Sequence, residues 1–502
     1  MSFAPDRARV AVASGNHLGA EAACEVARNG GNAVDACLAS AVMAWVAEPC
    51  FASVAGAGFV TVHDPSGEVT VYDGNCAMPL VPPQERGQGV SRIYLEYSNG
   101  MYTGIGGGSV AVPGVLAALH RAWERHGSIE WEALFEPTIR AAREGLPLPR
   151  TCDYYLKQTW AIWSRYDSAR ALLGRDGRPL EENEALVQAE LADALEAIAR
   201  SGPEIFYSGE LGRELTGAIA ADGGLVTIED LASYQVGERA PVATEAFGWS
   251  IKSNPPPAVG GAVLVHMLSL IEDAAPSGPL ARLKAVVAAE ETAVSHRELR
   301  YGDPADIAAG LSDVLAGSRP ARSSETTHSS AADRNGLACA LTQSNGYGAG
   351  LVVHGMALNN ALGEEELNPL GTHRLPPGAR CHSNMAPTIA EGAGKVVALG
   401  SPGGDRITGA IAQTIMSLAM DGASLAEAVS APRAHVAQRT EGKMMWYEPG
   451  LPGGEVDGDY LARPYDELHM FFGGVQAASV GSDRRVDAAH DPRRSGASVL
   501  IA

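Results

Sequence analysis

A run of hydroxyl side chains at residues 326–330 is the first part of this sequence whose residue types suggest chemistry. The run reads Thr-Thr-His-Ser-Ser, so it offers several oxygen nucleophiles and one imidazole. Hydroxyl clusters in loops ordinarily form turns or helix caps, because Ser and Thr side chains bond to nearby backbone groups. A hydroxyl becomes a catalytic nucleophile only when a base lies beside it. The run alone leaves both interpretations open, and His328 is better explained as a packed residue than as that base.

Two further segments contain groups that could assist such a hydroxyl. Residues 401–404 read Ser-Pro-Gly-Gly. Alone this is a simple turn, although glycines also let backbone N–H groups come close to an oxyanion. Residues 364–366 are three consecutive glutamates, which are typical of a solvated surface but can also bind an ammonium group. Neither segment identifies a reaction by itself.

The composition excludes several classes of partner. The chain has 502 residues, 46% of them hydrophobic, and a formal net charge of −21. That charge argues against nucleic acid and against an anionic membrane, because both need a basic surface. Seven scattered cysteines without a CxxC pair argue against a metal site or a disulfide framework. We expect no metal and no organic cofactor. Since we also find no apolar leader and no long apolar run, we expect a cytoplasmic protein.

The elements that must position these residues alternate between strands and helices. Strands are predicted at 8–13, 56–64, 68–73, 240–253, 336–344, 350–354, 386–390, 395–400, 475–480 and 497–502. Helices are predicted at 19–29, 33–47, within 115–235, and at 260–300, 407–420 and 424–430. Residues 315–325 are small and polar and include proline, typical of an exposed loop where chains are cut. Strand groups at both ends, with helices between them, predict two sheets sandwiched by helices.

Over nearly its whole length the sequence resembles the γ-glutamyltransferase family and related acylases. The segments that carry the resemblance are, in order, 30–36 (GGNAVDA), 55–59 (AGAGF), 110–115 (VAVPGV), 206–211 (FYSGEL), 223–234, 301–304 (YGDP), 326–329 (TTHS), 385–388 (MAPT), 401–404 (SPGG), 431–433 (APR) and 491–494 (DPRR). Any one of them could arise by chance. Their joint order identifies the chain as a member of this family.

The resemblance implies an α+β fold, a four-layer αββα sandwich of the N-terminal-nucleophile hydrolase type. It also implies that the precursor cuts itself between Glu325 and Thr326. The large segment (1–325) and the small segment (326–502) would then remain paired in one composite fold. The new α-amino group, with a pKa of ~8, would serve as the base for the Thr326 hydroxyl. A small-molecule amide would be cleaved through an acyl-enzyme on that residue.

The resemblance also assigns the rest of the site. By motif position, Ser344 would hold and polarise Thr326. The backbone N–H groups of Gly403 and Gly404 would form the oxyanion hole. The substrate-binding residues would be Asn75, Asn345, Glu364, Ser383 and Asn384.

The donor pocket departs from the family pattern. The family carries an arginine in a DFRExAP segment that grips the α-carboxylate of the glutamyl group, and Asn75 stands at that position. A neutral amide cannot replace a bidentate guanidinium–carboxylate pair. One of the family's paired serines is Asn384, and Glu364 stands where a shorter acid receives the donor ammonium. These changes favour hydrolysis of a different small amide over transpeptidation of glutathione.

Two alternatives remain open. The protein could be a genuine γ-glutamyltransferase that uses another cation in place of the lost arginine. It could also be an unprocessed, non-catalytic relative that binds a metabolite, although the joint retention of Thr326, Ser344, Gly403 and Gly404 speaks against this. The sequence leaves open the acyl group, the acceptor and any homo-oligomer.

Overall fold

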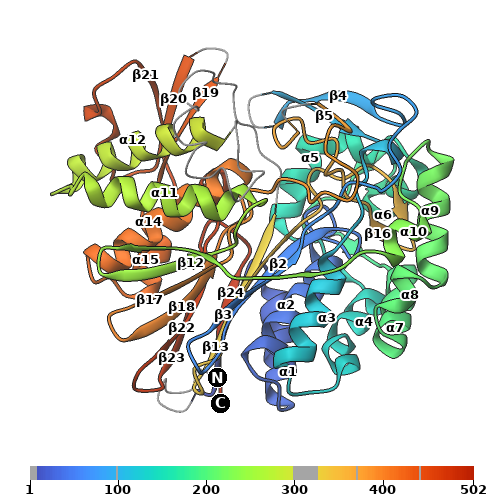
Figure 1. Ribbon diagram of the computed structural model, residues 1–502, viewed down its shortest axis with the longest axis horizontal. Coiled ribbons are helices and arrows are strands. Elements are labelled where there is room, and N and C mark those ends of the chain that lie inside the picture. Colours follow the sequence, from blue (N-terminus) through green and yellow to red (C-terminus); the bar gives the residue numbers. More distant parts are fainter. Residues whose placement is uncertain (1–7, 98–99, 298–325, 369–370, 440–441) are drawn as a thin grey trace.

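Two β-sheets lie face to face in the middle of the molecule, and helices cover the outer side of each (Figure 1). The computed structural model describes residues 8–97, 100–297, 326–368, 371–439 and 442–502. The predicted loop at 315–325, with Glu325, lies outside these residues. The predicted α+β fold is confirmed.

The first sheet combines strands from both sides of Thr326, and all of its neighbouring strands run antiparallel. Its order is β10 (Gly237–Arg239), β3 (Val69–Gly74), β2 (Ala57–His63), β14 (Ala338–Ser344), β13 (Thr327–Asp333), β1 (Val10–Ser14) and β24 (Ala497–Ile501). Strands β13 and β14 are buried along their whole length, because the second sheet covers one face and a helix covers the other.

The second sheet packs on the first through small side chains. Its order is β11 (Val242–Ala246), β12 (Trp249–Ser253), β17 (Thr388–Gly392), β18 (Lys395–Gly400), β22 (Gln476–Gly481) and β23 (Val486–Ala489). Alanines from both sheets, among them Ala332, Ala340, Ala398 and Ala478, form one buried cluster between them. Such small residues let the two backbones approach closely, which positions the ends of both sheets beside each other.

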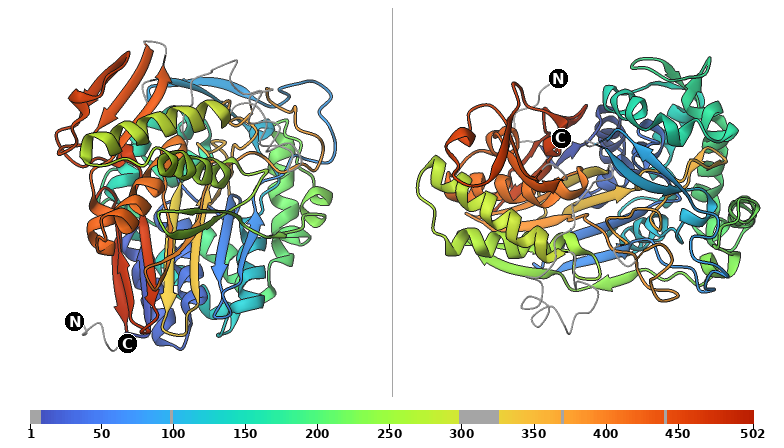
Figure 2. Two further views of the ribbon diagram at one scale, coloured as in Figure 1. Left: turned by 60° about the vertical axis from the view of Figure 1, so that its left-hand side comes forward. Right: turned by 90° about the horizontal axis from the view of Figure 1, so that it is seen from above.

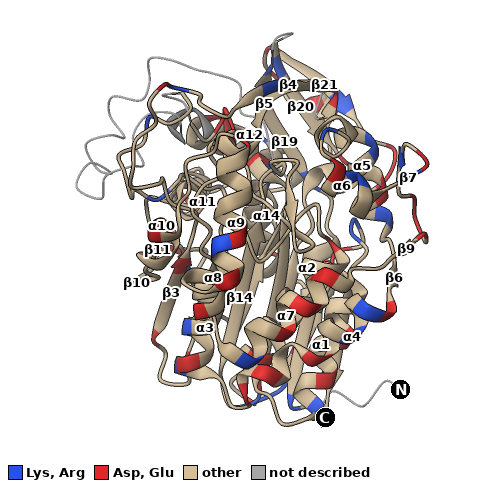
Figure 3. Cartoon of the chain, turned by 90° about the vertical axis from the view of Figure 1, so that its right-hand side faces the viewer, with Lys and Arg blue, Asp and Glu red and all other residues tan. Residues whose placement is uncertain are grey.

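The outer helices belong to two groups. The helices α1 (His17–Arg28), α2 (Ala33–Ala47) and α3 (Val115–His126) pack on the first sheet, and α11 (Val259–Asp273), α14 (Ile407–Met420) and α15 (Leu425–Ser430) pack on the second. Further helices are α4 (Glu136–Glu144), α5 (Arg150–Trp163), α6 (Asp167–Leu173), α7 (Ala189–Ser201), α8 (Glu204–Tyr207), α9 (Glu210–Ala221) and α10 (Ile228–Ala232). Lys, Arg, Asp and Glu residues are frequent along the helices on the side of the molecule that Figure 3 shows, while the strands behind them carry few. No helix among the described residues combines the length and apolar character needed to cross a membrane.

Several elements differ from the sequence prediction. The predicted helix at 260–300 is two helices, α11 and α12 (Pro279–Arg297), because Pro276 and Gly278, with a φ of 83°, interrupt it. The strand at 240–253 is the β11–β12 hairpin. The small sheets that were not predicted include β4 (Ser91–Leu95) with β5 (Met101–Ile105), β6 (Leu146–Pro147) with β9 (Ala185–Leu186), β7 (Gly174–Arg175) with β8 (Arg178–Pro179), and β19 (Ala434–Arg439) with β20 (Gly442–Tyr447) and β21 (Tyr460–Pro464). The β19–β21 sheet stands at the end of the molecule away from the C-terminus (Figure 2).

Candidate active site

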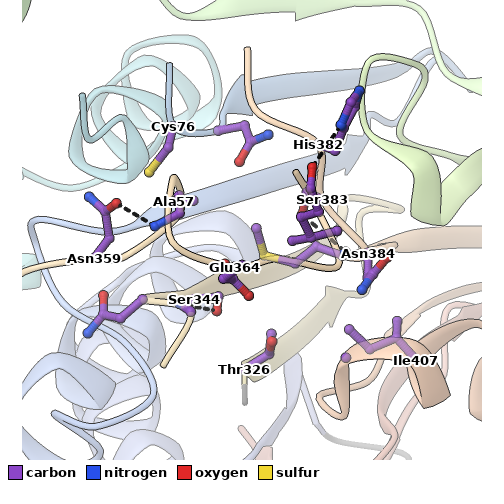
Figure 4. Close-up of a pocket in the computed structure, with 17 residues that line it drawn as sticks. Ala57, Cys76, Thr326, Ser344, Asn359, Glu364, His382, Ser383, Asn384 and Ile407 are labelled. Carbon is purple, nitrogen blue, oxygen red and sulfur yellow. Dashed lines mark hydrogen bonds between the residues drawn. The ribbon is translucent and has the colours of Figure 1, made fainter. Parts of the chain in front are cut away.

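A pocket with about 410 Å³ of space lies at one end of both sheets, where neighbouring strands begin or end (Figure 4). Strand β14 ends at Ser344, β2 begins at Ala57, and Gly404 follows the end of β18. The pocket is lined by Ala57, Asn75, Cys76, Thr326, Ser344, Asn345, Gly346, Asn359, Ala361, Glu364, Leu367, His382, Ser383, Asn384, Met385, Gly404 and Ile407.

Most residues predicted from the sequence meet in this pocket although they lie far apart in the chain. Asn75, Thr326, Ser344, Asn345, Glu364, Ser383, Asn384 and Gly404 all line it. Gly403 is the neighbour of Gly404 but does not itself line the pocket. Glu325 lies outside the described residues, so the proposed cleavage bond stays a prediction.

Thr326 is distinguished from the rest of the hydroxyl run by its place at the end of the strand, beside the pocket. It is buried and lines the pocket, directly before β13. In the β13–β14 ladder Thr327 pairs with Gln343. Continuing this register by one residue places Thr326 opposite Ser344, where side chains of an antiparallel pair meet. The two hydroxyl residues named in the sequence prediction therefore share one edge of the pocket.

The other members of the run bond inside the protein. The Thr327 hydroxyl donates to the Glu48 carboxylate at 2.8 Å, and the Ser329 hydroxyl bonds to that of Ser40 at 2.8 Å. Both ring nitrogens of His328 bond to hydroxyls, those of Thr342 and Ser330, each at 2.8 Å. Burial lowers the pKa of His328 to about 3, so its ring is neutral and structural, as the sequence interpretation favoured.

The glycine pair lies in a turn that only glycine adopts easily. Gly403 has a φ of 123° and Gly404 a φ of 57°, values that an L side chain rarely tolerates. A 3-10 turn, Gly404–Arg406, leads from them directly into α14. Backbone N–H groups at the start of a helix lack intrahelical partners and favour negative charge. This end of the pocket is therefore suited to an oxyanion.

Asn75 is tied into the pocket wall. Its amide donates to the Cys381 carbonyl at 2.6 Å. The backbone carbonyl of Asn75 accepts hydrogen bonds from the Tyr234 hydroxyl at 2.6 Å and from the Arg380 guanidinium at 3.2 Å. Arg380 also donates to the Gln235 carbonyl and stacks over the Tyr234 ring, 4.1 Å from its centroid. An arginine thus lies behind Asn75, but it does not line the pocket.

Glu364 is buried, and it is the one Asp or Glu side chain in the described lining, which contains no Lys or Arg. It stands close to Gly346, where a Cβ would lie 2.7 Å from a Glu364 carboxylate oxygen. The solvated-surface interpretation of this glutamate is therefore wrong. Its neighbour Glu365 does reach solvent, where it pairs with Arg92 at 2.5 Å.

Two of the predicted asparagine and serine residues, Asn345 and Ser383, also contact the surrounding framework. The Asn345 amide donates to the Pro49 carbonyl at 3.4 Å. The Ser383 carbonyl accepts from the N–H groups of Val259 and Gly260 at the start of α11, and Asn384 follows it on the pocket wall (Figure 4).

Sequence reasoning missed part of the wall. Cys76, Asn359, Leu367, His382, Met385 and Ile407 line the pocket and were not predicted. Cys76, His382 and Met385 each adjoin a predicted residue in the sequence, which is the signal that could have found them. Asn359 is a structural tie, since its amide donates to the carbonyls of Ala55 and Ala111. Burial raises the pKa of the Cys76 thiol well above its usual value, so it is a neutral side chain and not a thiolate nucleophile.

The chain is similar to known proteins over nearly its whole length. A model of the γ-glutamyltranspeptidase family matches residues 19–317 and 312–501. The glutathione hydrolase proenzyme of Escherichia coli (strain K12) is 28% identical, over 98% of this chain and 92% of its own. The acylase ACY 1 proenzyme of Pseudomonas sp. (strain SE83) is also 28% identical, over 97% and 92%.

The fold is shared with a solved acylase. The crystal structure of cephalosporin acylase from Bacillus halodurans superimposes with a TM-score of 0.83 at 23% identity, covering 98% of this chain and 96% of that one. At this identity the likeness concerns the fold alone, while the family model spans nearly the whole sequence. The chain therefore belongs to the γ-glutamyltranspeptidase family of amide hydrolases and acyltransferases.

Proposed function

We propose that this protein cleaves itself before Thr326 and then hydrolyses a small amide through an acyl-enzyme on that residue. The observation that carries the proposal is the position of Thr326, which alone in its hydroxyl run lines the pocket and continues the strand register opposite Ser344. The curated relatives are proenzymes by name, which supports the cut. Family membership also disfavours a non-catalytic metabolite-binding protein.

The cut supplies the base that a threonine hydroxyl lacks. A free α-amino group has a pKa of about 8, so a useful fraction is neutral at physiological pH. This amine takes the proton of the Thr326 hydroxyl as the oxygen adds to the amide carbonyl. The N–H groups of Gly403 and Gly404 hold the oxyanion, and the amine passes the proton to the departing nitrogen. Water then attacks the ester in the same manner, releasing the acid and restoring the threonine.

The charges of the lining favour an acyl group without a carboxylate. The carboxylate in the described lining belongs to Glu364, and no Lys or Arg accompanies it there. The side-chain amide of Asn75 donates its hydrogen bond to the Cys381 carbonyl. An anionic acyl group would therefore enter a buried site of the same sign, which is unfavourable. We expect a neutral or ammonium-bearing acyl group, and hydrolysis in preference to transpeptidation.

The test begins with intact mass under denaturing conditions. Two fragments ending at Glu325 and beginning at Thr326 are expected, and Thr326→Ala should remain one chain. The mass of the small fragment is then measured after brief incubation with a panel of amides that carry neutral, cationic and anionic acyl groups. An added mass on the small fragment names the acyl donor. A chain that stays uncut and turns over no amide would contradict the proposal.

A second candidate is genuine γ-glutamyl transfer, favoured by one observation. Arg380 lies directly behind Asn75, bonded to its carbonyl at 3.2 Å, so a cation is close to the position of the lost arginine. Rapid release of the amine from a γ-glutamyl anilide, lost in Arg380→Gln, would support this candidate. Turnover of other amides without the anilide would dismiss it.

A further inference from the structure

We infer that Arg494 and Arg433 are positioning residues for the oxyanion-binding glycines, and that they act through the turn at residues 470–473. The inference rests on the proposed function, because that function gives Gly403 and Gly404 their role in turnover. Neither arginine lines the pocket. Both belong to segments that match the family pattern, 431–433 and 491–494, to which the sequence assigned no task.

Every carbonyl of the 470–473 turn accepts a hydrogen bond from an arginine. The Met470 carbonyl accepts from Arg494 at 3.4 Å, Phe471 from Arg406 at 2.9 Å, Phe472 from Arg433 at 3.2 Å and Gly473 from Arg494 at 3.3 Å. The turn is a 3-10 helix, Met470–Phe472, closed by Gly473 with a φ of 91°. Carbonyls at a helix C-terminus lack intrahelical partners, and cations stabilise them. The arginines therefore determine where this turn lies.

The 470–473 turn supports the loop that carries Gly403 and Gly404. The Gly474 N–H donates to the Ser401 hydroxyl at 2.9 Å. A Cβ on Gly403 would lie 3.1 Å from the Gly473 Cα, and a Cβ on Gly473 would lie 2.6 Å from the Ser401 hydroxyl. The two backbones are thus in contact with no side chain between them. A shift of the turn passes directly to Gly403.

A buried ionic network fixes Arg433, and the Arg494 backbone N–H donates to the carbonyl of Asp491, a member of that network, at 3.2 Å. Arg433 pairs with Asp491 at 2.7 Å, Arg493 pairs with the same carboxylate at 3.0 Å, and Arg493 also bonds to Glu448 at 2.7 Å. Burial opposes the charge on Asp491, but Arg433 and Arg493 outweigh it and hold the pKa of Asp491 below its usual value. The Asp491 carboxylate also accepts a hydrogen bond from the Val475 N–H at 2.8 Å. The network therefore also holds the segment that follows the 470–473 turn.

A displacement of Gly403 and Gly404 should lower kcat and leave KM nearly unchanged. Donors that move away from the oxyanion weaken the transition state, while the substrate in its ground state uses other parts of the pocket. Small misplacements of catalytic groups cost up to about 100-fold in rate. We expect Arg494→Lys to lower kcat by about 10- to 100-fold with KM within about threefold of wild type, since lysine keeps the charge but not the two-pronged contact.

The experiment combines kinetics with hydrogen exchange in the full chain. Arg494→Lys is compared with Arg9→Lys, because Arg9 also donates to two backbone carbonyls, those of Gly31 and Ala27, but at the opposite end of the first sheet. A second variant, Gly473→Ala, presses the turn against Ser401 without removing an arginine. Mass-resolved exchange is followed for peptides covering 401–406 and 470–475, and rates are expressed per cut molecule.

The expected result is faster exchange at 401–406 together with reduced kcat in Arg494→Lys and Gly473→Ala, and neither change in Arg9→Lys. Unchanged exchange at 401–406 in the folded variants overturns the inference, whatever happens to the rate. A kcat loss no larger than that of Arg9→Lys also overturns it. If the wild type turns over no amide, the proposed function fails, and the exchange comparison still decides whether Arg494 and the 470–473 turn position the loop.

Discussion

The two sides of the pocket are built in different ways. On the nucleophile side, the β13–β14 register sets Thr326 opposite Ser344, and the turn after β18 sets Gly404. On the acyl side, Asn75 and Asn384 come from segments outside the strands, and contacts with Cys381, Tyr234 and Arg380 hold Asn75. Under the proposed function, the sheets position the reacting groups, while the residues that select the substrate lie in segments that can change without disturbing the strands.

The largest effect expected is that of removing the nucleophile. Thr326→Ala should abolish the cut and lower turnover by at least about 10⁴-fold, because no other hydroxyl of the run lines the pocket. Electrophoresis and a turnover assay measure both. Thr327→Ala is the matched neighbour: its hydroxyl bonds to Glu48, so it should lose about 1–2 kcal/mol of stability and still be cut. Normal processing in Thr326→Ala would contradict the comparison.

A smaller effect on the same side is expected at Ser344. Its hydroxyl accepts from the Gly346 N–H at 2.9 Å, and it stands opposite Thr326 in register. Ser344→Ala should lower kcat by about 10- to 100-fold because the nucleophile loses a hydroxyl that orients it. Thermal unfolding of the same variant separates this from a general loss of structure. A kcat equal to wild type would remove Ser344 from the catalytic side.

On the acyl side, substitution should change KM instead of kcat. Asn384→Ser restores the serine pair of the family beside Ser383 and changes one polar contact to the acyl group. Such a contact is worth about 1 kcal/mol, so KM should shift by about three- to tenfold, in opposite directions for different amides. Steady-state kinetics on two amides measures the split. A large kcat change with constant KM would show that the two sides are not separate.

The sequence named Thr326, Ser344 and Gly404, which do meet in the pocket, because their positions are tied to strands and to a glycine turn. Strand β14 and the strand before Gly404 have alternating or continuous apolar residues that mark them. The register that puts Thr326 against Ser344 was not predictable, because β13 reads Thr-His-Ser-Ser-Ala-Ala-Asp and lacks the large branched residues typical of strands. Its burial comes from alanine packing between two sheets, which is a tertiary effect.

The sequence named acyl-side residues that do line the pocket, but the contacts behind them and the arginine network could not be predicted, for a different reason. Arg433 and Asp491 lie far apart in the chain, and only the packing of β22 and β23 against α15 brings their segments together. The sequence left open another cation in place of the lost arginine but did not identify Arg380, because its position behind Asn75 depends on contacts with Tyr234 and the Gln235 carbonyl. Contacts of this kind follow from tertiary structure and not from local pattern.

The smallest effect tests the inner face of the nucleophile strand and depends on pH. His328 is fully buried, its ring lies against Gly400, where a Cβ would be 2.4 Å away, and burial lowers its pKa to about 3. In the unfolded chain the pKa is about 6.5, so between pH 6.5 and 3 the unfolded state binds more protons and stability falls as pH falls. The slope expected is about 1 kcal/mol per pH unit in that window, with no contribution above it. Denaturant unfolding of wild type and His328→Gln at pH 7, 6 and 5 measures this. The variant should be less stable at pH 7, and its free energy of unfolding should fall less steeply as the pH is lowered. Equal slopes for the two proteins would mean that burial of the neutral His328 ring does not cause the loss of stability in acid.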